Sequence, residues 1–110
     1  MYGGCPELYS RNYRETLDVP ELENFLKEHH DYKYATVVHG DTPSGMLNDV
    51  SAICPLLKKY GIMTVVDSVS ASFGEPMRIS DWQIDIMCGG SQKVVSAPPG
   101  LTFVVISDDA

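Results

Sequence analysis

The sequence predicts an α/β fold built on a mostly parallel sheet. Three short apolar runs, residues 34–38, 62–66 and 84–88, lack the alternation of a half-exposed strand, and such runs are typical of strands buried on both faces. Segments with helical features precede or separate the first runs, as in right-handed parallel crossovers. A fourth run, 101–106, follows after a short loop and is therefore expected to be antiparallel. The expected architecture is a three-layer sandwich.

The N-terminal part predicts a loop followed by a helix. Residues 1–16 mix glycine, proline and tyrosine and are expected to form an irregular segment. Asp18 is a candidate N-cap, and Pro20 suits the first turn of the helix that follows. The apolar face of this helix is expected to consist of Leu22, Phe25, Leu26 and His29, which recur at helical spacing.

A second helix is expected between the first two strands. Asn48 or Asp49 can cap it, and it should run to about Tyr60. Pro55 has no N–H to donate, so a kink or a first-turn position is expected there. Gly61 can end the helix in a left-handed conformation. The apolar face of this helix is expected to contain Ile53, Leu56, Leu57 and Tyr60.

Composition narrows the class of protein. The 110 residues suit a single domain spanning 1–110. A net charge of -7 argues against a nucleic-acid-binding face, and no apolar run reaches the length of a membrane span. The N-terminus lacks the features of a signal peptide. Three widely spaced cysteines fit reduced thiols better than disulfides or a metal site, so a cytoplasmic protein is expected.

Polar residues follow the predicted strands at their carboxyl ends, where open α/β sheets bind ligands. Thr42 follows the first strand, Asp67 ends the second, and Gln92 and Lys93 follow the third. A lysine amine condenses with an aldehyde to give a Schiff base, and pyridoxal 5'-phosphate (PLP) is an aldehyde cofactor that also needs an acid beside its pyridine nitrogen. Asp67 can supply that acid, because a carboxylate stabilises the protonated nitrogen.

The remaining groups suit the same cofactor. Thr42 can hydrogen-bond near the ring 3-oxygen, Gln92 can donate to the phosphate, and Val69 can present an apolar surface to the ring. Simpler roles exist for several of these residues. Lys93 can be a surface lysine, Asp67 a strand-end cap and Gln92 a polar loop residue. His39 is interpreted as a structural residue at a strand end rather than as an acid–base group.

Three stretches carry a resemblance to a known family. HGDTPSG, VVDSVSASFGEPM and IDIMCGGSQKVVSAPPG, with the spacing between them, resemble the class V aminotransferases, which are PLP enzymes of fold type I. The sequence is most similar to the alanine–glyoxylate and serine–pyruvate group, over about residues 18–107. Because family members are several times longer, the chain is expected to be the central part of the PLP-binding large domain.

The resemblance implies a role for each site residue. Lys93 would form the Schiff base, Asp67 would pair with the pyridinium, and Val69 would lie against the ring. Thr42 would bond the ring side and Gln92 the phosphate. In the complete enzyme, Lys93 would shuttle the Cα proton while an amino group moves from alanine or serine to a 2-oxo acid such as glyoxylate or pyruvate. A homodimer is also expected.

Two alternatives stay open. One is a different class V PLP enzyme, such as a cysteine desulfurase or lyase, or an aminoethylphosphonate transaminase; desulfurases usually carry histidine where this sequence has Gln92. The other is a catalytically inactive fragment that folds and self-associates, since an unpaired sheet edge favours association.

Overall fold

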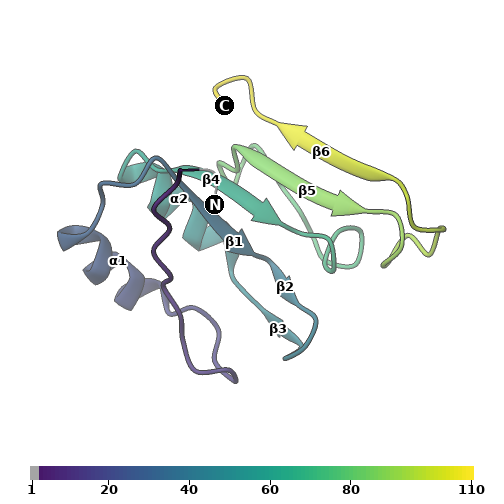
Figure 1. The fold of residues 1–110 in the computed structure, drawn as a ribbon, viewed down its shortest axis with the longest axis horizontal. Coiled ribbons are helices and arrows are strands. Elements are labelled where there is room, and N and C mark those ends of the chain that lie inside the picture. Colours follow the sequence, from purple (N-terminus) through teal and green to yellow (C-terminus); the bar gives the residue numbers. More distant parts are fainter. Residues whose placement is uncertain (1–2) are drawn as a thin grey trace.

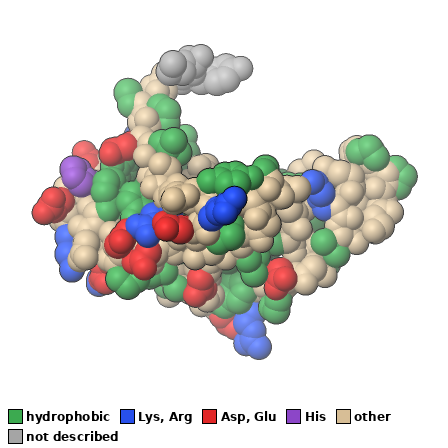
Figure 2. Space-filling model, turned by 90° about the horizontal axis from the view of Figure 1, so that it is seen from below, with side chains coloured by type: hydrophobic (Ala, Val, Ile, Leu, Met, Phe, Trp, Pro, Cys, Tyr) green, Lys and Arg blue, Asp and Glu red, His purple; other side chains and the backbone are tan. Residues whose placement is uncertain are grey.

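The computed structural model describes residues 3–110; Tyr2, expected in the N-terminal loop, lies outside them. Two helices are present, α1 (Val19–Glu28) and α2 (Val50–Lys59). The main sheet contains β1 (Tyr34–Val38), β4 (Met63–Asp67), β5 (Ile86–Gly90) and β6 (Thr102–Ile106), and a small ladder contains β2 (Gly40–Asp41) and β3 (Met46–Leu47). Figure 1 shows these elements in space, and Figure 2 shows the side chains in a space-filling view from below.

The main sheet has the order β1-β4-β5-β6. Strands β1, β4 and β5 are parallel, and β6 pairs with β5 in the antiparallel direction. The carboxyl ends of the three parallel strands therefore lie along one side of the sheet, as Figure 1 shows. This arrangement confirms the predicted mixed α/β class and the antiparallel last strand.

Both helices contribute to one apolar core on one face of the sheet. Val37, Val66 and Met87 are in register across β1, β4 and β5, and all three belong to the core cluster. The helices add Leu22, Leu26, Ile53, Cys54, Leu56 and Leu57 to it. The opposite face carries exposed apolar side chains such as Val38 and Ile106. Residues 3–110 thus supply two of the three expected layers, the sheet and the helices on one side.

The helix ends follow the sequence closely. The Asp18 side chain accepts a hydrogen bond from the N–H of Glu21, and Asp49 accepts one from the N–H of Ala52. Asp49 is therefore the second N-cap, not Asn48. Gly61 has φ +73° directly after α2, which is the left-handed conformation that glycine adopts without strain.

Four local expectations were wrong or incomplete. His29, expected on the apolar face of the first helix, is exposed and caps the C-terminus of α1. Of the two positions expected for Pro55, the first turn is excluded, because Pro55 lies inside α2. The third strand runs from Ile86 to Gly90 instead of 84–88. Before the regular ladder begins, the Asp85 carboxylate accepts the N–H of Thr64, and the N–H of Asp85 donates to the Thr64 hydroxyl. The segment after β1 was expected to be a loop because of its Pro and Gly residues, but it contains the β2–β3 hairpin.

Neither helix in the described residues is long and apolar enough to cross a membrane. The three cysteines are free; Cys5 is exposed, Cys54 is buried and Cys88 is half-buried. Within residues 3–110, no group of three or more His, Cys, Asp or Glu side chains is arranged to hold a metal ion.

Candidate functional site

The predicted site residues lie on consecutive segments along the carboxyl side of the sheet. Val38, Asp67 and Cys88 are in register across the three parallel strands. Thr42 lies in the hairpin loop after β1, and Lys93 lies three residues beyond the last residue of β5. Figure 1 shows the hairpin, the turn after β4 and the loop after β5 on this side of the sheet. The parallel topology is therefore what brings these residues to one edge.

Asp67 ends β4 with an exposed side chain. Its Oδ1 accepts a hydrogen bond of 3.1 Å from the N–H of Val69, which orients the carboxylate toward the turn. Its backbone carbonyl accepts a 2.9 Å bond from the N–H of His39. The bond to Val69 is what a strand-end cap makes, and it leaves the other carboxylate oxygen available to a ligand. Val69 is half-buried in the same turn.

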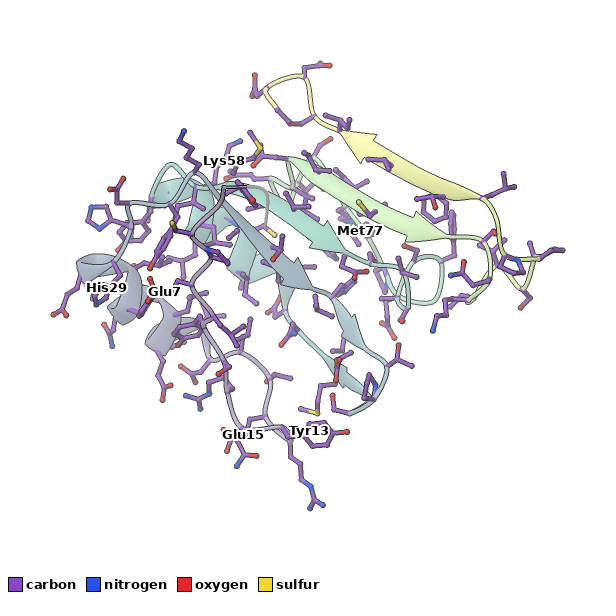
Figure 3. All side chains as sticks on the ribbon, viewed as in Figure 1. Glu7, Tyr13, Glu15, His29, Lys58 and Met77 are labelled. Atoms are coloured by element: carbon purple, nitrogen blue, oxygen red, sulfur yellow. The ribbon has the colours of Figure 1, made fainter. Side chains whose placement is uncertain are left out.

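Thr42 is tied to the turn after β4. Its Oγ1 lies 2.6 Å from Oγ of Ser70, across 28 residues of sequence. Nothing in the sequence indicates Ser70 as the partner of Thr42, so this bond was not expected. The hairpin loop is also held from its other side, where the hydroxyl of Tyr13 donates to the carbonyl of Pro43 at 3.0 Å. Figure 3 shows Tyr13 reaching the hairpin from the N-terminal segment.

The loop after β5 is closed by its own hydrogen bonds. The buried Ser91 donates from Oγ to the carbonyl of Pro98 at 2.7 Å, and its carbonyl accepts the N–H of Ala97 at 3.0 Å. The N–H of Ser96 donates to the carbonyl of Lys93 at 2.9 Å, and Ser96 itself has φ +56°. These bonds fix the backbone that carries the two site residues of this loop.

Gln92 and Lys93 both have exposed side chains. The amide of Gln92 folds back over Gly90, since a Cβ atom at Gly90 would lie 2.6 Å from Gln92 Oε1. Within residues 3–110, the Lys93 amine makes no hydrogen bond or ion pair. No described side chain therefore competes with a ligand for this amine.

His39 occupies the junction between β1 and the hairpin and is buried. Its Nδ1 lies 3.1 Å from Oγ of Ser68, which is also buried. Burial lowers the pKa of His39, and the negative charge of Glu75 opposes this effect. The sequence correctly indicated that His39 lies at the end of a strand, but it did not indicate that the ring contacts the hydroxyl of Ser68.

A second polar cluster lies at the opposite end of the sheet and was missed. Asp85 is buried, pairs with Lys58, and accepts hydrogen bonds from Thr64. Figure 3 shows Lys58 beyond the amino ends of the strands, away from the candidate site. The sequence does contain a signal for this cluster. Asp85 is a charged residue inside the apolar run Ile84 to Met87, and a buried charge requires a partner.

The groups on the carboxyl side fit a PLP molecule. A free amine, a carboxylate on the neighbouring strand, two linked hydroxyls and a flexible amide are the donors and acceptors that an aldehyde cofactor with a pyridine ring and a phosphate requires. Because Gly90 has no Cβ atom, the amide of Gln92 has room beside the end of β5.

Comparisons with known proteins agree with this chemistry. The sequence profile described as Aminotransferase class-V matches residues 8–110. Pyridoxamine–pyruvate transaminase of Mesorhizobium japonicum is 37% identical over 98 residues, which are 89% of this chain and 25% of that protein. A 2-aminoethylphosphonate–pyruvate transaminase of Bacillus cytotoxicus is 33% identical over 99 residues, covering 90% of this chain and 27% of that protein.

Solved structures give the same result. Pyridoxamine–pyruvate aminotransferase from Mesorhizobium loti superposes with a TM-score of 0.83 at 36% identity, over 88% of this chain and 25% of that one. Alanine–glyoxylate aminotransferase from Nostoc sp. also gives 0.83, at 25% identity, over 91% and 26%. The chain thus spans about a quarter of the length of the relatives it matches. It belongs to the class-V aminotransferase family and has the fold type I architecture of PLP-dependent aminotransferases, and this membership implies pyridoxal phosphate as the cofactor.

Proposed function

We propose that the protein to which this chain contributes is a PLP-dependent aminotransferase in which Lys93 holds the cofactor. The observation that carries this proposal is the free amine of Lys93, in a hydrogen-bonded loop after β5, next to the strand that ends in Asp67. The cofactor supplies the electron sink that stabilises negative charge at the Cα of an amino acid. Lys93 would then accept and return the Cα proton as a general base.

The other site residues would bind and orient the cofactor. Asp67 would lie beside the pyridine nitrogen and keep it protonated through charge pairing. Thr42, held by Ser70, would hydrogen-bond the side of the ring, and Val69 would contact its apolar face. Gln92 would donate to the phosphate from its position over the end of β5.

The proposed reaction moves an amino group from a small amino acid, alanine or serine, to a 2-oxo acid, glyoxylate or pyruvate. The names of the similar proteins support a 2-oxo acid partner, because pyruvate or glyoxylate occurs in each of the four described above. Those names differ in the amino compound. They therefore support the acceptor class more strongly than any one donor.

A second candidate is transfer from 2-aminoethylphosphonate to pyruvate. The observation that favours it is the 33% identity to the Bacillus cytotoxicus transaminase. A panel of donors separates the candidates. With pyruvate as the acceptor, serine or 2-aminoethylphosphonate would each yield alanine, and alanine as the donor is tested with glyoxylate, which it would convert to glycine while becoming pyruvate. Gln92 remains the residue that disfavours a cysteine desulfurase.

We also propose that the protein is a homodimer and that it is cytoplasmic. A homodimer is supported by the exposed β6 edge strand, whose Ile106 and Val104 are open to solvent. A cytoplasmic location is supported by three free cysteines. The inactive-fragment alternative predicts folding and self-association without cofactor chemistry.

The test is to mix the purified chain with PLP, reduce the product with borohydride and map the labelled peptides. We expect the label on Lys93, because its loop follows β5 at the carboxyl side of the sheet, beside the strand that ends in Asp67. The Lys93→Arg variant should lose the label, while the matched Lys33→Arg variant should keep it. Label spread over Lys58, Lys59 and other lysines, or no label, would show that this chain alone does not assemble the site.

A further inference from the structure

His39 connects three segments that carry the candidate site. Its N–H donates to the carbonyl of Asp67 at 2.9 Å, which joins it to the end of β4. Its carbonyl accepts the N–H of Asn48 at 2.8 Å, which closes the base of the hairpin that carries Thr42. Its ring contacts the hydroxyl of Ser68 at 3.1 Å. One residue thus links β4, the hairpin and the turn after β4.

The ring contact does something that the backbone bonds do not. The N–H and carbonyl of residue 39 would bond as they do with any side chain, so the imidazole is not needed for them. Burying an imidazole and a hydroxyl costs free energy unless they bond to each other. An apolar side chain would fill the same space without that cost. The specific effect of the His39–Ser68 contact is therefore to hold the turn of residues 68–72 against the end of β1.

That turn transmits the position of Ser68 to the site. The carbonyl of Ser68 accepts the N–H groups of Ala71 at 3.1 Å and Ser72 at 2.7 Å, and Ser72 Oγ at 2.6 Å. These three bonds make residues 68–72 a compact unit. Ser70 in this unit bonds to Thr42, and Asp67 immediately precedes it. A displacement of Ser68 would therefore move the partners of both Thr42 and Asp67.

We propose that His39 is a positioning residue, whose ring-to-hydroxyl bond to Ser68 sets the relative position of Asp67 and Thr42 for the cofactor. The geometric part stands on the contacts above, and the cofactor part rests on the proposed function. His39 does not need to touch the cofactor for this role. Its burial also keeps the ring neutral near pH 7, and a neutral ring can either donate to or accept from the Ser68 hydroxyl.

The variants are chosen to separate positioning from general stability. His39→Leu removes the bond and keeps an apolar side chain of similar size. His39→Asn places an amide near the position of Nδ1 and can restore the bond. Ser68→Ala removes only the hydroxyl and serves if His39→Leu fails to fold. Thr64→Val is the matched control, because it removes a buried hydrogen bond at the opposite end of β4.

The first readout needs no cofactor. Amide resonances of Thr42, Asp67 and Ser70 are compared by two-dimensional NMR in the ligand-free chain. We expect them to shift in His39→Leu, to return toward wild type in His39→Asn, and to stay in place in Thr64→Val. Unchanged resonances in both His39→Leu and Ser68→Ala would overturn the proposal.

The second readout is the affinity for PLP, followed by absorbance. We expect His39→Leu to weaken binding about tenfold, which corresponds to about 1.4 kcal/mol, and His39→Asn to recover most of it. Equal weakening in Thr64→Val would show that stability, not positioning, sets affinity, and would overturn the proposal. If wild type binds no PLP while the resonances shift as expected, the proposed function of this chain fails and the geometric role of His39 stands.

Discussion

Lys58 and Asp85 form an ion pair that joins the last turn of α2 to the residue preceding β5. The Asp85 side chain is 3% exposed, whereas that of Lys58 is 39% exposed. The carboxylate also accepts the N–H of Thr64 at 2.8 Å and its hydroxyl at 3.2 Å. Burial raises the pKa of Asp85, but Lys58 and Thr64 together bring it below its ordinary value. The cluster therefore fixes α2, β4 and β5 at the end of the sheet away from the site.

The unequal burial of this pair predicts an asymmetry between two variants. Lys58→Met leaves a buried carboxylate without its counter-charge and should lower the free energy of unfolding by about 2–4 kcal/mol. This loss is somewhat smaller than that for breaking a fully buried ion pair, because Lys58 is partly hydrated. Asp85→Asn should cost less, since Lys58 can turn toward water and the amide oxygen can still accept from Thr64. Urea unfolding curves measure both changes.

A control for the asymmetry is the pair between Lys59 and Glu23, which lies on the surface. Lys59→Met should change stability far less than Lys58→Met, because water screens exposed pairs. If Asp85→Asn proved more destabilising than Lys58→Met, the account of Asp85 as the buried, dependent partner would be wrong.

The buried His39 predicts a loss of stability in mild acid. An unfolded histidine takes up a proton at about pH 6.5, whereas burial lowers the pKa of His39 in the folded chain. The unfolded state then binds more protons, so stability rises with pH. As pH falls below about 6.5, the free energy of unfolding should decrease until the lowered pKa of the folded state is passed. His39→Asn should show a shallower pH dependence in urea unfolding between pH 5 and 7.5, and parallel curves would contradict this.

The topology could be predicted from the sequence because backbone rules determine it. The apolar runs of β1 and β4, with a helix between them, favour parallel pairing through a crossover, and the short connection to 101–106 favours an antiparallel return. No helix lies between β4 and β5, which pair in parallel through a long irregular connection. Asp18 predicted the start of the first helix and Gly61 the end of the second, because capping depends on residues that are close in sequence. Local signals were therefore sufficient wherever the interaction spans a few residues.

The contacts that tune the site could not be predicted in this way. The pairs Thr42–Ser70 and His39–Ser68 span 28 and 29 residues, and their side chains meet only because β1 and β4 are adjacent and in register. Small hydroxyl residues in a turn carry no periodic pattern that would indicate such a partner. The β5 boundary was misplaced for a similar reason, since the bonds of Asp85 to Thr64 depend on the fold.

Alanine is expected to affect stability differently at two adjacent glycines in β5. A Cβ at Gly89 would lie 2.0 Å from the ring of Phe103, and both residues pair across β5 and β6. Gly89→Ala should therefore destabilise the chain by about 1–3 kcal/mol through overpacking, and adding Phe103→Leu should recover part of the loss. If Gly89→Ala left the urea midpoint unchanged, the ring would have to be free to move aside.

Gly90→Ala should instead leave stability nearly unchanged. Its Cβ would meet the amide of Gln92 at 2.6 Å, and that amide is the exposed end of a flexible side chain that can swing away. Because Gln92 is the proposed phosphate donor, PLP binding should weaken several-fold, by about 1 kcal/mol for one lost hydrogen bond. Gln92→Ala should give the same loss, and the double variant should lose no more than either one. Additive losses in the titration would show that Gly90 acts through something other than Gln92.

The three thiols should differ widely in reactivity. Burial raises the pKa of Cys54 to about 12, so almost none of it is the reactive thiolate at pH 8. Cys5 is exposed and Cys88 is half-buried on the sheet face that the helices leave open. Alkylation followed by peptide mapping should therefore label Cys5 first, Cys88 more slowly and Cys54 only through unfolding. The Cys54 rate should rise in Lys58→Met, because that variant populates the unfolded state more. A Cys54 rate equal to that of Cys5 in the folded wild-type chain would contradict the packing of α2 against the sheet.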